Sequence, residues 1–215
     1  MAMYWFNTGA VDLTPQIAGT VSHYKTTGST LTFNLPPCEV GETRLVAVAS
    51  IRAYMSSRPP TGWVTIQDNG SWSNNNLYVF GRAKQAGDSD AVSWATAGYD
   101  SEFIAFVVVL PKILPVPNAS AKTEGTGITW PTPALTTTVP NCLILRYAVS
   151  SGTGVEDIIW PSDVEPIFAY TIPNKLTLGA SIQKAKEPGV YAAVNAGQSA
   201  SRRFSTTSVA AAPAV

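Results

Sequence analysis

The residues of this chain that could do chemistry are paired carboxylates and a single histidine. Acidic side chains stand one or two positions apart at four places: Asp88/Asp90, Asp100/Glu102, Glu156/Asp157 and Asp163/Glu165. Two carboxylates flanking a cleft would suit glycoside hydrolysis, but acids so close together in turns are more often solvated. His23 lies in a polar stretch, and the sequence has no Gly-x-Ser-x-Gly nucleophile elbow. We therefore predict no catalytic residues, and a hydrolase is the least favoured of three hypotheses.

Metal and cofactor chemistry has little support in the sequence. The stretch Gly-Asp-Ser-Asp at 87–90 offers hard oxygen ligands, so calcium on Asp88 and Asp90 is a side hypothesis, although the spacing of an EF-hand loop is missing. Neither glycine-rich motif that cradles nucleotide phosphates occurs. Cys38 and Cys142 lack the close spacing of a zinc or redox site, which favours free buried thiols and leaves a single disulfide open. We expect no cofactor.

Aromatic residues suggest a binding function. The stretch 68–76 reads as a long hairpin connection in which Trp72 lies among polar residues, and Trp72 with Asn74, Asn75 and Asn76 could contact a glycan. The alternative, which we favour, is a tryptophan folded back over the edge of a sheet, because large amphipathic rings mostly cover cores. Trp63 and Trp94 stand in predicted strands and are core candidates.

The amino end carries a second aromatic cluster. Tyr4, Trp5 and Phe6 are consecutive, and the segment up to about residue 20 shows no strand partner. Three aromatic rings on a free terminus would expose much apolar surface, so we expect them to be buried against something. One hypothesis is an arm that docks on a neighbouring subunit; the other is a segment that folds back on its own domain.

Charge and hydropathy exclude several classes of partner. Fourteen basic and fourteen acidic residues cancel, charged residues are only 13% of the chain, and no block of like charge occurs, which argues against nucleic-acid or membrane-surface binding. The start has neither a basic region nor an apolar core of leader length, which predicts synthesis in a cytoplasm without a signal peptide. The apolar run 103–110 is too short to span a bilayer and reads as a buried strand.

Short runs of β-branched and aromatic residues between turn-forming residues predict an all-β fold. We expect strands near 30–35, 44–54, 63–67, 76–84, 91–96 and 102–110, and again near 129–138, 142–150, 165–171, 176–184, 190–195 and 202–210. Alternation along 45–52 and 143–150 places one mostly apolar row on the inner face of each strand. Prolines and small polar residues at 111–127 predict a linker.

The two halves share landmarks in the same order. Leu45 precedes Leu143 by 98 residues (143 − 45), and Leu77 precedes Leu176 by 99 (176 − 77). A proline turn and a glycine turn recur 101 and 102 residues apart, at 60 and 161 and at 87 and 189. We predict an internal duplication that gives two tandem antiparallel, jelly-roll-like β-sandwiches. The expected divisions are an arm at 1–20, sandwiches at 21–112 and 128–215, and a linker at 113–127.

The first half contains a series of motifs in a fixed order: LVAVASI (45–51), PPTGWVT (59–65), LYVFGRAKQAGD (77–88), VSW (92–94) and the apolar strand 102–110. This series resembles a repeat found in tail-associated and other structural proteins of tailed bacteriophages. In the second half the motif is degenerate, because Val164 and Ala193 stand where the first half has Trp63 and Trp94.

The resemblance implies a non-enzymatic component of a virion, either tail-associated or capsid-decorating. It would be synthesised in the host bacterial cytoplasm and would contact other virion proteins and copies of itself. The alternative is a carbohydrate-binding module that contacts a host surface glycan through loops such as 68–76.

Overall fold

The computed structural model describes residues 14–15, 17–25, 29–51, 61–69, 75–95, 102–111 and 119–213. All elements within these ranges are β-strands, so the predicted all-β fold is confirmed. The first half contains β1 (Gly19–Lys25), β2 (Thr30–Asn34), β3 (Thr43–Ser50), β4 (Val64–Asp68), β5 (Asn76–Ala83), β6 (Ala91–Ala95) and β7 (Phe103–Leu110). The second half contains β8 (Ala119–Thr132), β9 (Leu135–Thr137), β10 (Cys142–Ser151), β11 (Glu165–Ile172), β12 (Leu176–Ala185), β13 (Gly189–Tyr191) and β14 (Val194–Ala211).

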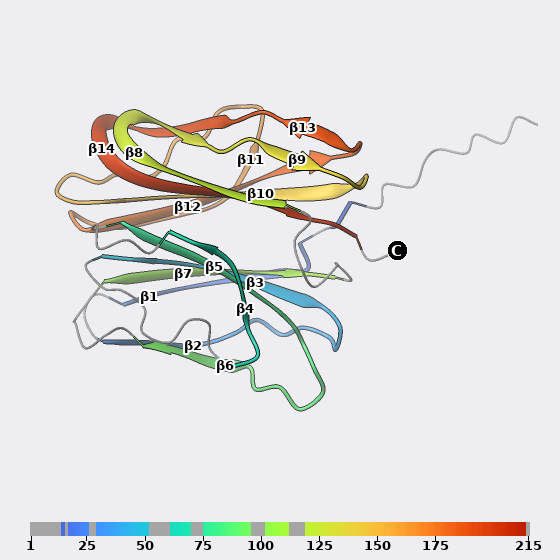
Figure 1. The fold of residues 1–215 in the computed structure, drawn as a ribbon. Coiled ribbons are helices and arrows are strands. Elements are labelled where there is room, and N and C mark those ends of the chain that lie inside the picture. The colour runs from blue at the N-terminus through green and yellow to red at the C-terminus, as the bar shows by residue number, and fades with distance from the viewer. Residues whose placement is uncertain are drawn as a thin grey trace, which may run out of the picture.

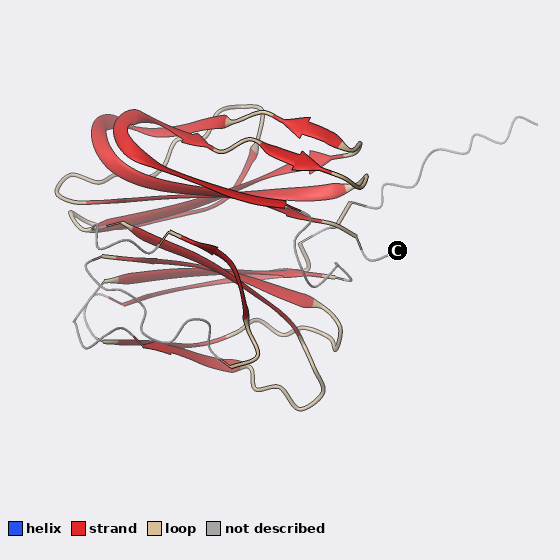
Figure 2. Ribbon diagram, viewed as in Figure 1, coloured by secondary structure: helices blue, strands red, loops and turns tan. Residues whose placement is uncertain are grey.

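The strands form four layers (Figure 1). Two five-stranded antiparallel sheets lie in the middle: sheet I has the order β1-β7-β3-β5-β4, and sheet II has the order β11-β12-β10-β14-β8. Each is covered on its outer side by a two-stranded sheet, β2-β6 (roof 1) over sheet I and β13-β9 (roof 2) over sheet II. The long strands β8 and β14 bend at one end and continue into the outer layer beside roof 2 (Figures 1 and 2).

The second half repeats the topology of the first. Adding seven to every strand number of sheet I and roof 1 gives the pairings of sheet II and roof 2. The irregularities recur as well, since β4 and β11 each carry a bulge, at Ile66 and at Ile167, which are 101 residues apart (167 − 66). Gly41 and Asn141 both have positive φ and both donate their backbone N–H to a lysine carbonyl, that of Lys84 and that of Lys186 respectively. The internal duplication is therefore present strand for strand; we call the halves unit 1 and unit 2.

Strand register corrects the predicted offset of the repeat. Leu45 lies between Gly81 and Val108 in sheet I, whereas Leu143 lies between Lys184 and Ala211. The matching trio in sheet II is Ile182–Leu145–Val209. Leu45 thus corresponds to Leu145 (145 − 45 = 100) and Gly81 to Ile182 (182 − 81 = 101), not to residues 98 or 99 farther on. Apolar residues repeat every second position in a strand, so the sequence alone allowed a slip of two residues.

The largest core lies between the two units. It contains the alternate residues Leu45, Ala47 and Ala49 of β3 and, from β10, Leu145, Tyr147 and Val149, together with their neighbours in both sheets. We call this apolar layer between sheets I and II the seam. The opposite faces of β3 and β10 are buried too, under the roofs, so both central strands lie at the fully buried end of the half-to-full burial that their sequences predicted.

A separate core fills the space between each five-stranded sheet and its outer layer. In unit 1 it contains Trp63 and Trp94, which are 6% and 0% exposed, so both predicted core tryptophans are confirmed. In unit 2 the corresponding space is split between a cluster around Trp130 and Phe204 and a cluster around Leu135 and Ile144. Roof 2 is shorter than roof 1, and the bent ends of β8 and β14 supply the rest of the cover.

Two of the predicted segment boundaries differ from the structure. Residues 119–127, predicted as linker, belong to β8, which pairs with β14 and forms an edge of sheet II. Gly19 and Thr20, predicted as part of the arm, begin β1, which pairs with β7. Edge strands have one hydrogen-bonding side free, so their sequences do not need the continuous apolar pattern of a central strand.

Candidate functional site

The seam joins equivalent faces of the two units. Strand β12 contacts β3 and β7, and its counterpart β5 contacts β10 and β14, which are the counterparts of β3 and β7. Every one of these contacts therefore has a reciprocal partner, as at an interface between two identical subunits related by a two-fold axis. The seam is the intramolecular equivalent of such an isologous interface.

Polar side chains tie the units together at one end of the seam. Asn75 and Ser151 are hydrogen-bonded through their side chains, and Ser205 Oγ donates to the backbone oxygen of Asn75. Asn69 donates from Nδ2 to the backbone oxygen of Thr206. Amide side chains buried in this way fix the relative position of two packed elements, because any shift leaves them without partners.

An ion pair adds to these contacts. Lys175 Nζ lies 2.5 Å from Glu102 Oε1, which joins the turn before β12 to the residue preceding β7. A shallow cavity of about 220 Å³ lies beside this pair and is lined by Ile51, Ser151 and Asn174 among others.

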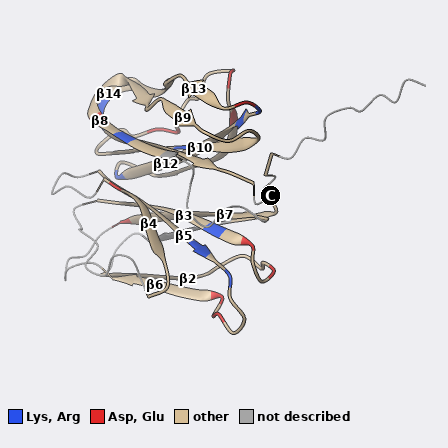
Figure 3. Ribbon diagram, turned by 45° about the vertical axis from the view of Figure 1, so that its right-hand side comes forward, with Lys and Arg blue, Asp and Glu red and all other residues tan. Residues whose placement is uncertain are grey.

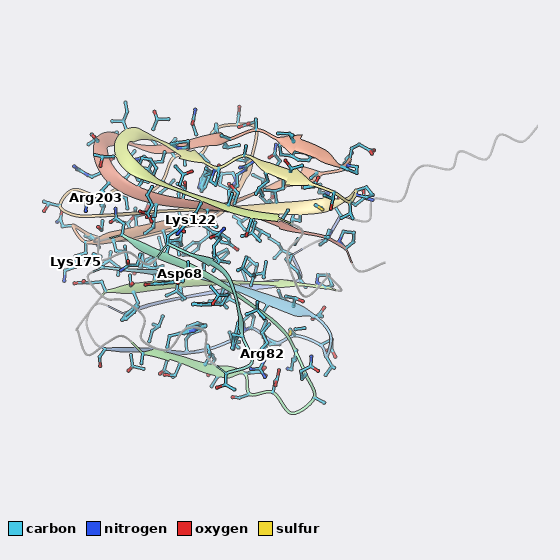
Figure 4. All side chains as sticks on the ribbon, in the orientation of Figure 1. Asp68, Arg82, Lys122, Lys175 and Arg203 are labelled. Carbon is cyan, nitrogen blue, oxygen red and sulfur yellow. The ribbon has the colours of Figure 1, made fainter. Side chains whose placement is uncertain are left out.

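The corner where β4 of sheet I meets β8 of sheet II is closed by hydrogen bonds. Gln67 Nε2 donates to Ser120 Oγ over 3.2 Å, and Ser120 Oγ donates to the backbone oxygen of Ile66. Lys122 Nζ donates to the backbone oxygen of Asp68 over 2.6 Å (Figure 4). We call this the closed corner. These bonds use polar groups of two edge strands that would otherwise face solvent.

The pseudo-equivalent corner, between β1 and β11, holds a groove instead. A cavity of about 530 Å³ opens there, and its apolar walls come from Pro15, Ile17, Leu143, Ile167 and Ile182. Thr20, Glu165, Pro166 and Lys184 complete the lining. Beside it, the rings of Phe106 and Phe168 stack across the seam with centroids 4.3 Å apart. We call this groove the open corner; its size falls in the range of small-ligand and peptide pockets.

A cluster of ion pairs lies at the end of unit 1, where β3, β5 and β6 bring opposite charges together (Figure 3). Arg82 binds both carboxylate oxygens of Asp88, and Arg44 and Lys84 both contact Asp90. The hydrogen bond from Arg82 lowers the pKa of Asp88, with a further contribution from the backbone N–H of Gln85. The hydrogen bonds from Arg44 and Lys84 lower the pKa of Asp90.

This cluster bears on the predicted calcium ligands. The oxygens of Asp88 that a cation would need already accept charge-assisted bonds, and one oxygen of Asp90 accepts from two cationic side chains. Asp90 therefore neutralises Arg44, which is 2% exposed, and holds the loop after β5 against β3, while Asp88 neutralises Arg82. A cavity of about 320 Å³ borders the cluster.

Unit 2 uses a different buried arginine in the corresponding layer. Arg146 of β10 is fully buried, and its guanidinium donates to five neutral acceptors, on Thr132, Pro133, Gln183, Ala192 and Ser208. Burial lowers its pKa to about 10, while the charge of Asp163 acts in the opposite direction. The arginine joins β8, β12 and β14 beneath roof 2, which is a structural role.

The predicted glycan-contact residues separate into two groups. Asn75 and Asn76 are 0% and 1% exposed, so the exposure that a glycan contact requires is absent at both positions. Asn76 begins β5 and Asn75 precedes it at the seam, where Asn75 forms hydrogen bonds between the two units. Trp72 and Asn74 lie outside the described residues, as do Tyr4, Trp5 and Phe6 of the predicted docking arm.

The remaining candidates for chemistry do not converge. His23 belongs to β1 at an edge of sheet I. Glu156 and Asp157 accept hydrogen bonds from Ser199 and Thr171 respectively. Within the described ranges, no three His, Cys, Asp or Glu side chains are grouped so that they could hold a metal ion. Cys38 and Cys142 are free thiols, which confirms the favoured prediction, although Cys38 is only half-buried.

Sequence reasoning missed the residues that line the open corner. Ile17 lies before any predicted strand, and Ile167 and Ile182 look like ordinary core positions in the sequence. A signal was present in β11, whose apolar residues at 167, 168 and 170 do not alternate, as expected for a bulged edge strand.

The part of the chain that the structure describes contains no α-helix long and apolar enough to cross a bilayer. The sequence matches no protein-family model, and no curated protein or solved structure matches the chain.

Proposed function

We propose that the protein is a non-enzymatic structural component of a bacteriophage virion, tail-associated or capsid-decorating, that acts through contacts between subunits. The observation that carries the proposal is the seam, in which two copies of one sandwich unit bury equivalent faces against each other. Symmetric assemblies of structural proteins are built from such isologous contacts. The sequence resemblance to phage structural repeats supports the same assignment.

The outer face of roof 1 is the surface that we expect to contact neighbours. Thr32, Asn34, Ala91 and Ser93 project from it and are exposed, and the Thr32 and Ser93 hydroxyls are hydrogen-bonded 2.9 Å apart. None of these side chains is charged, so no ionic group has to lose its hydration when a partner covers the face. An uncharged face of short side chains suits close packing against another β-surface.

Rebinding to particles that lack the protein tests the proposal. Phage particles produced without the gene are mixed with purified protein, separated from unbound chain by density, and analysed by quantitative mass spectrometry and electron microscopy. We expect saturation at a fixed copy number and density at one defined location. Three, six or twelve copies would indicate the tail and hundreds the capsid surface. Binding that never saturates, or no binding, contradicts the proposal.

A matched pair of variants locates the contact face. Thr32→Lys places a charge on the outer face of roof 1, and Thr126→Lys places the same charge on an exposed position of β8. We expect Thr32→Lys to reduce the bound copy number at least tenfold and Thr126→Lys to leave it unchanged, with equal melting temperatures for both. Equal binding by the two variants would exclude roof 1 as the contact face.

A further inference from the structure

The open corner and the closed corner occupy equivalent places in a duplicated fold, yet they differ in chemistry. In the repeat, Thr20 and Ile167 of the open corner correspond to Ser120 and Ile66 of the closed corner, by the offsets of 100 and 101 residues that the register gives. Hydrogen bonds between edge strands close one corner, whereas the other contains a cavity of about 530 Å³.

The open corner has more hydrocarbon side chains than the closed corner, although Thr20, Glu165 and Lys184 also line it. Phe106 and Phe168, which stack beside the groove, occupy the places that Thr207 and Gln67 occupy at the closed corner. Ile182 in the groove wall corresponds to Gly81. The isoleucine, leucine and proline side chains of this groove stay in contact with water unless another group covers them.

We propose that the aromatic segment Tyr4-Trp5-Phe6 of the same chain occupies this groove. Thirteen residues precede Thr14, and Pro15, which lines the groove, is buried, as is Thr14 before it. The nine residues from Phe6 to Pro15 span up to about 30 Å when extended, which is more than enough to return to a groove that begins at Pro15.

The chemistry of the segment fits the groove. Tyr4, Trp5 and Phe6 carry large apolar surfaces, and the groove offers isoleucine, leucine and proline side chains. The polar lining residues Thr20, Glu165 and Lys184 suit the tyrosine hydroxyl and the indole N–H of such a segment. Asn7, Thr8 and Gly9 follow directly and are residue types that allow the chain to reverse direction. A segment of the same chain also has a concentration at the groove in the millimolar range, far above that of a second copy in dilute solution.

This inference goes beyond the proposed function, because it concerns the isolated chain. The segment acts as a strap that crosses from unit 1 to unit 2, since the groove has walls from β1 of one unit and from β11 and β12 of the other. It thereby covers the apolar side chains of the groove beside Phe106 and Phe168.

Disulfide trapping in the full chain tests the strap. One variant combines Asn7→Cys, next to the aromatic segment, with Glu165→Cys at the groove. The other combines Asn7→Cys with Val64→Cys at the equivalent place in β4. Both carry Cys38→Ser, so that the buried Cys142 is the only native cysteine left. Val64 is 48% exposed and is a matched control, because Val64 and Glu165 pair with the equivalent residues Gly81 and Ile182. Cross-links form under mild oxidation and are assigned by mass spectrometry.

We expect the 7–165 disulfide to form within one chain at least ten times faster than the 7–64 disulfide. Replacing Tyr4, Trp5 and Phe6 together by alanine should slow the 7–165 cross-link at least tenfold, and this change cannot disrupt the described core. Equal rates at 165 and 64, rates unaffected by the alanines, or cross-links only between two chains would each overturn the proposal. None of these results bears on particle binding, so the two proposals fail independently.

Discussion

Leu45 and Leu145 occupy the same place in the repeat and measure how strongly the seam couples the units. Each lies on the central strand of its sheet and faces the seam, and they are 2% and 0% exposed. Shortening a buried leucine to alanine removes methyl groups from the core and leaves a cavity, at a cost of about 2–5 kcal/mol in the free energy of unfolding.

The structure predicts that the two variants lose different amounts of unfolding free energy within that range. The side chain of Leu45 lies over Gly81, where an added Cβ would be 3.2 Å from Leu45 Cδ2, so position 81 has no side chain to fill the cavity. Ile66 already lies over the same glycine, with Cδ1 2.8 Å from that Cβ position. Leu145 has Ile182 in the equivalent place, and an isoleucine can relax into the space. We therefore expect Leu45→Ala to cost about 4–5 kcal/mol and Leu145→Ala about 2–3 kcal/mol, because the cost depends on how far the site collapses.

The assay combines thermal unfolding with hydrogen exchange. For a chain of this length each kcal/mol lowers the melting temperature by about 2–4 °C, so Leu45→Ala should melt roughly 8–20 °C below the parent. Hydrogen exchange followed by mass spectrometry then reads peptides from β7 and β12, which belong to different units. Since the seam is the largest core, each variant should accelerate global exchange in both peptides.

Two results would refute this reasoning. If Leu145→Ala accelerated exchange only in β12 and left β7 unchanged, the units would unfold independently and the seam would not couple them. If Leu145→Ala lowered the free energy of unfolding as much as Leu45→Ala does, the glycine beside Leu45 would not determine how far the cavity collapses. A surface substitution on β8, Thr126→Ala, serves as the control and should change the melting temperature by no more than a degree or two.

Three further outcomes are expected. A protease site inserted in 112–118 and then cleaved should leave the halves co-eluting at the volume of the intact chain, because the seam holds them; separation on a sizing column would contradict this. The pKa values of Asp88 and Asp90 are lowered in the folded state, so their ion pairs stabilise it above about pH 4, the unfolded value. That stability is lost as the pH falls below it, and acid titration of Asp88→Asn and Asp90→Asn should show a smaller loss than the parent. Burial raises the thiol pKa of Cys38 and Cys142, so a chromogenic disulfide at pH 8 should label Cys38 slowly and Cys142, 0% exposed, only after denaturation.

The central strands could be predicted from the sequence because burial imposes a strong pattern. The strands expected near 44–54, 76–84, 142–150 and 176–184 are β3, β5, β10 and β12, which carry long buried runs. Their apolar residues on both faces were visible, but which face met which sheet was not. The seam depends on contacts between residues about one hundred positions apart, and local periodicity contains no information about such pairing.

The edge strands and the open corner could not be predicted in the same way. Strand β1 has the sequence GTVSHYK and β8 begins ASAKTEG, so neither shows a continuous apolar row. Both are held by backbone pairing to one neighbour, which places few demands on the side chains; an edge strand even tolerates a proline, as β8 does at Pro131. The burial of Asn75 was missed for a related reason. A run of asparagines suggests an exposed loop, and only the position of unit 2 places this one under cover.

Joining both copies in one polypeptide frees them from a restriction that identical subunits cannot escape. In a homodimer, a substitution that enlarges a side chain near the two-fold axis occurs in both subunits, so two large side chains must then fit into the same part of the interface. Ala47 and Tyr147 occupy equivalent positions in the two units, as the strand registers show. The fused chain can thus have a methyl group at this position in unit 1 and a phenol ring in unit 2. A homodimer of identical chains could not form such an asymmetric interface.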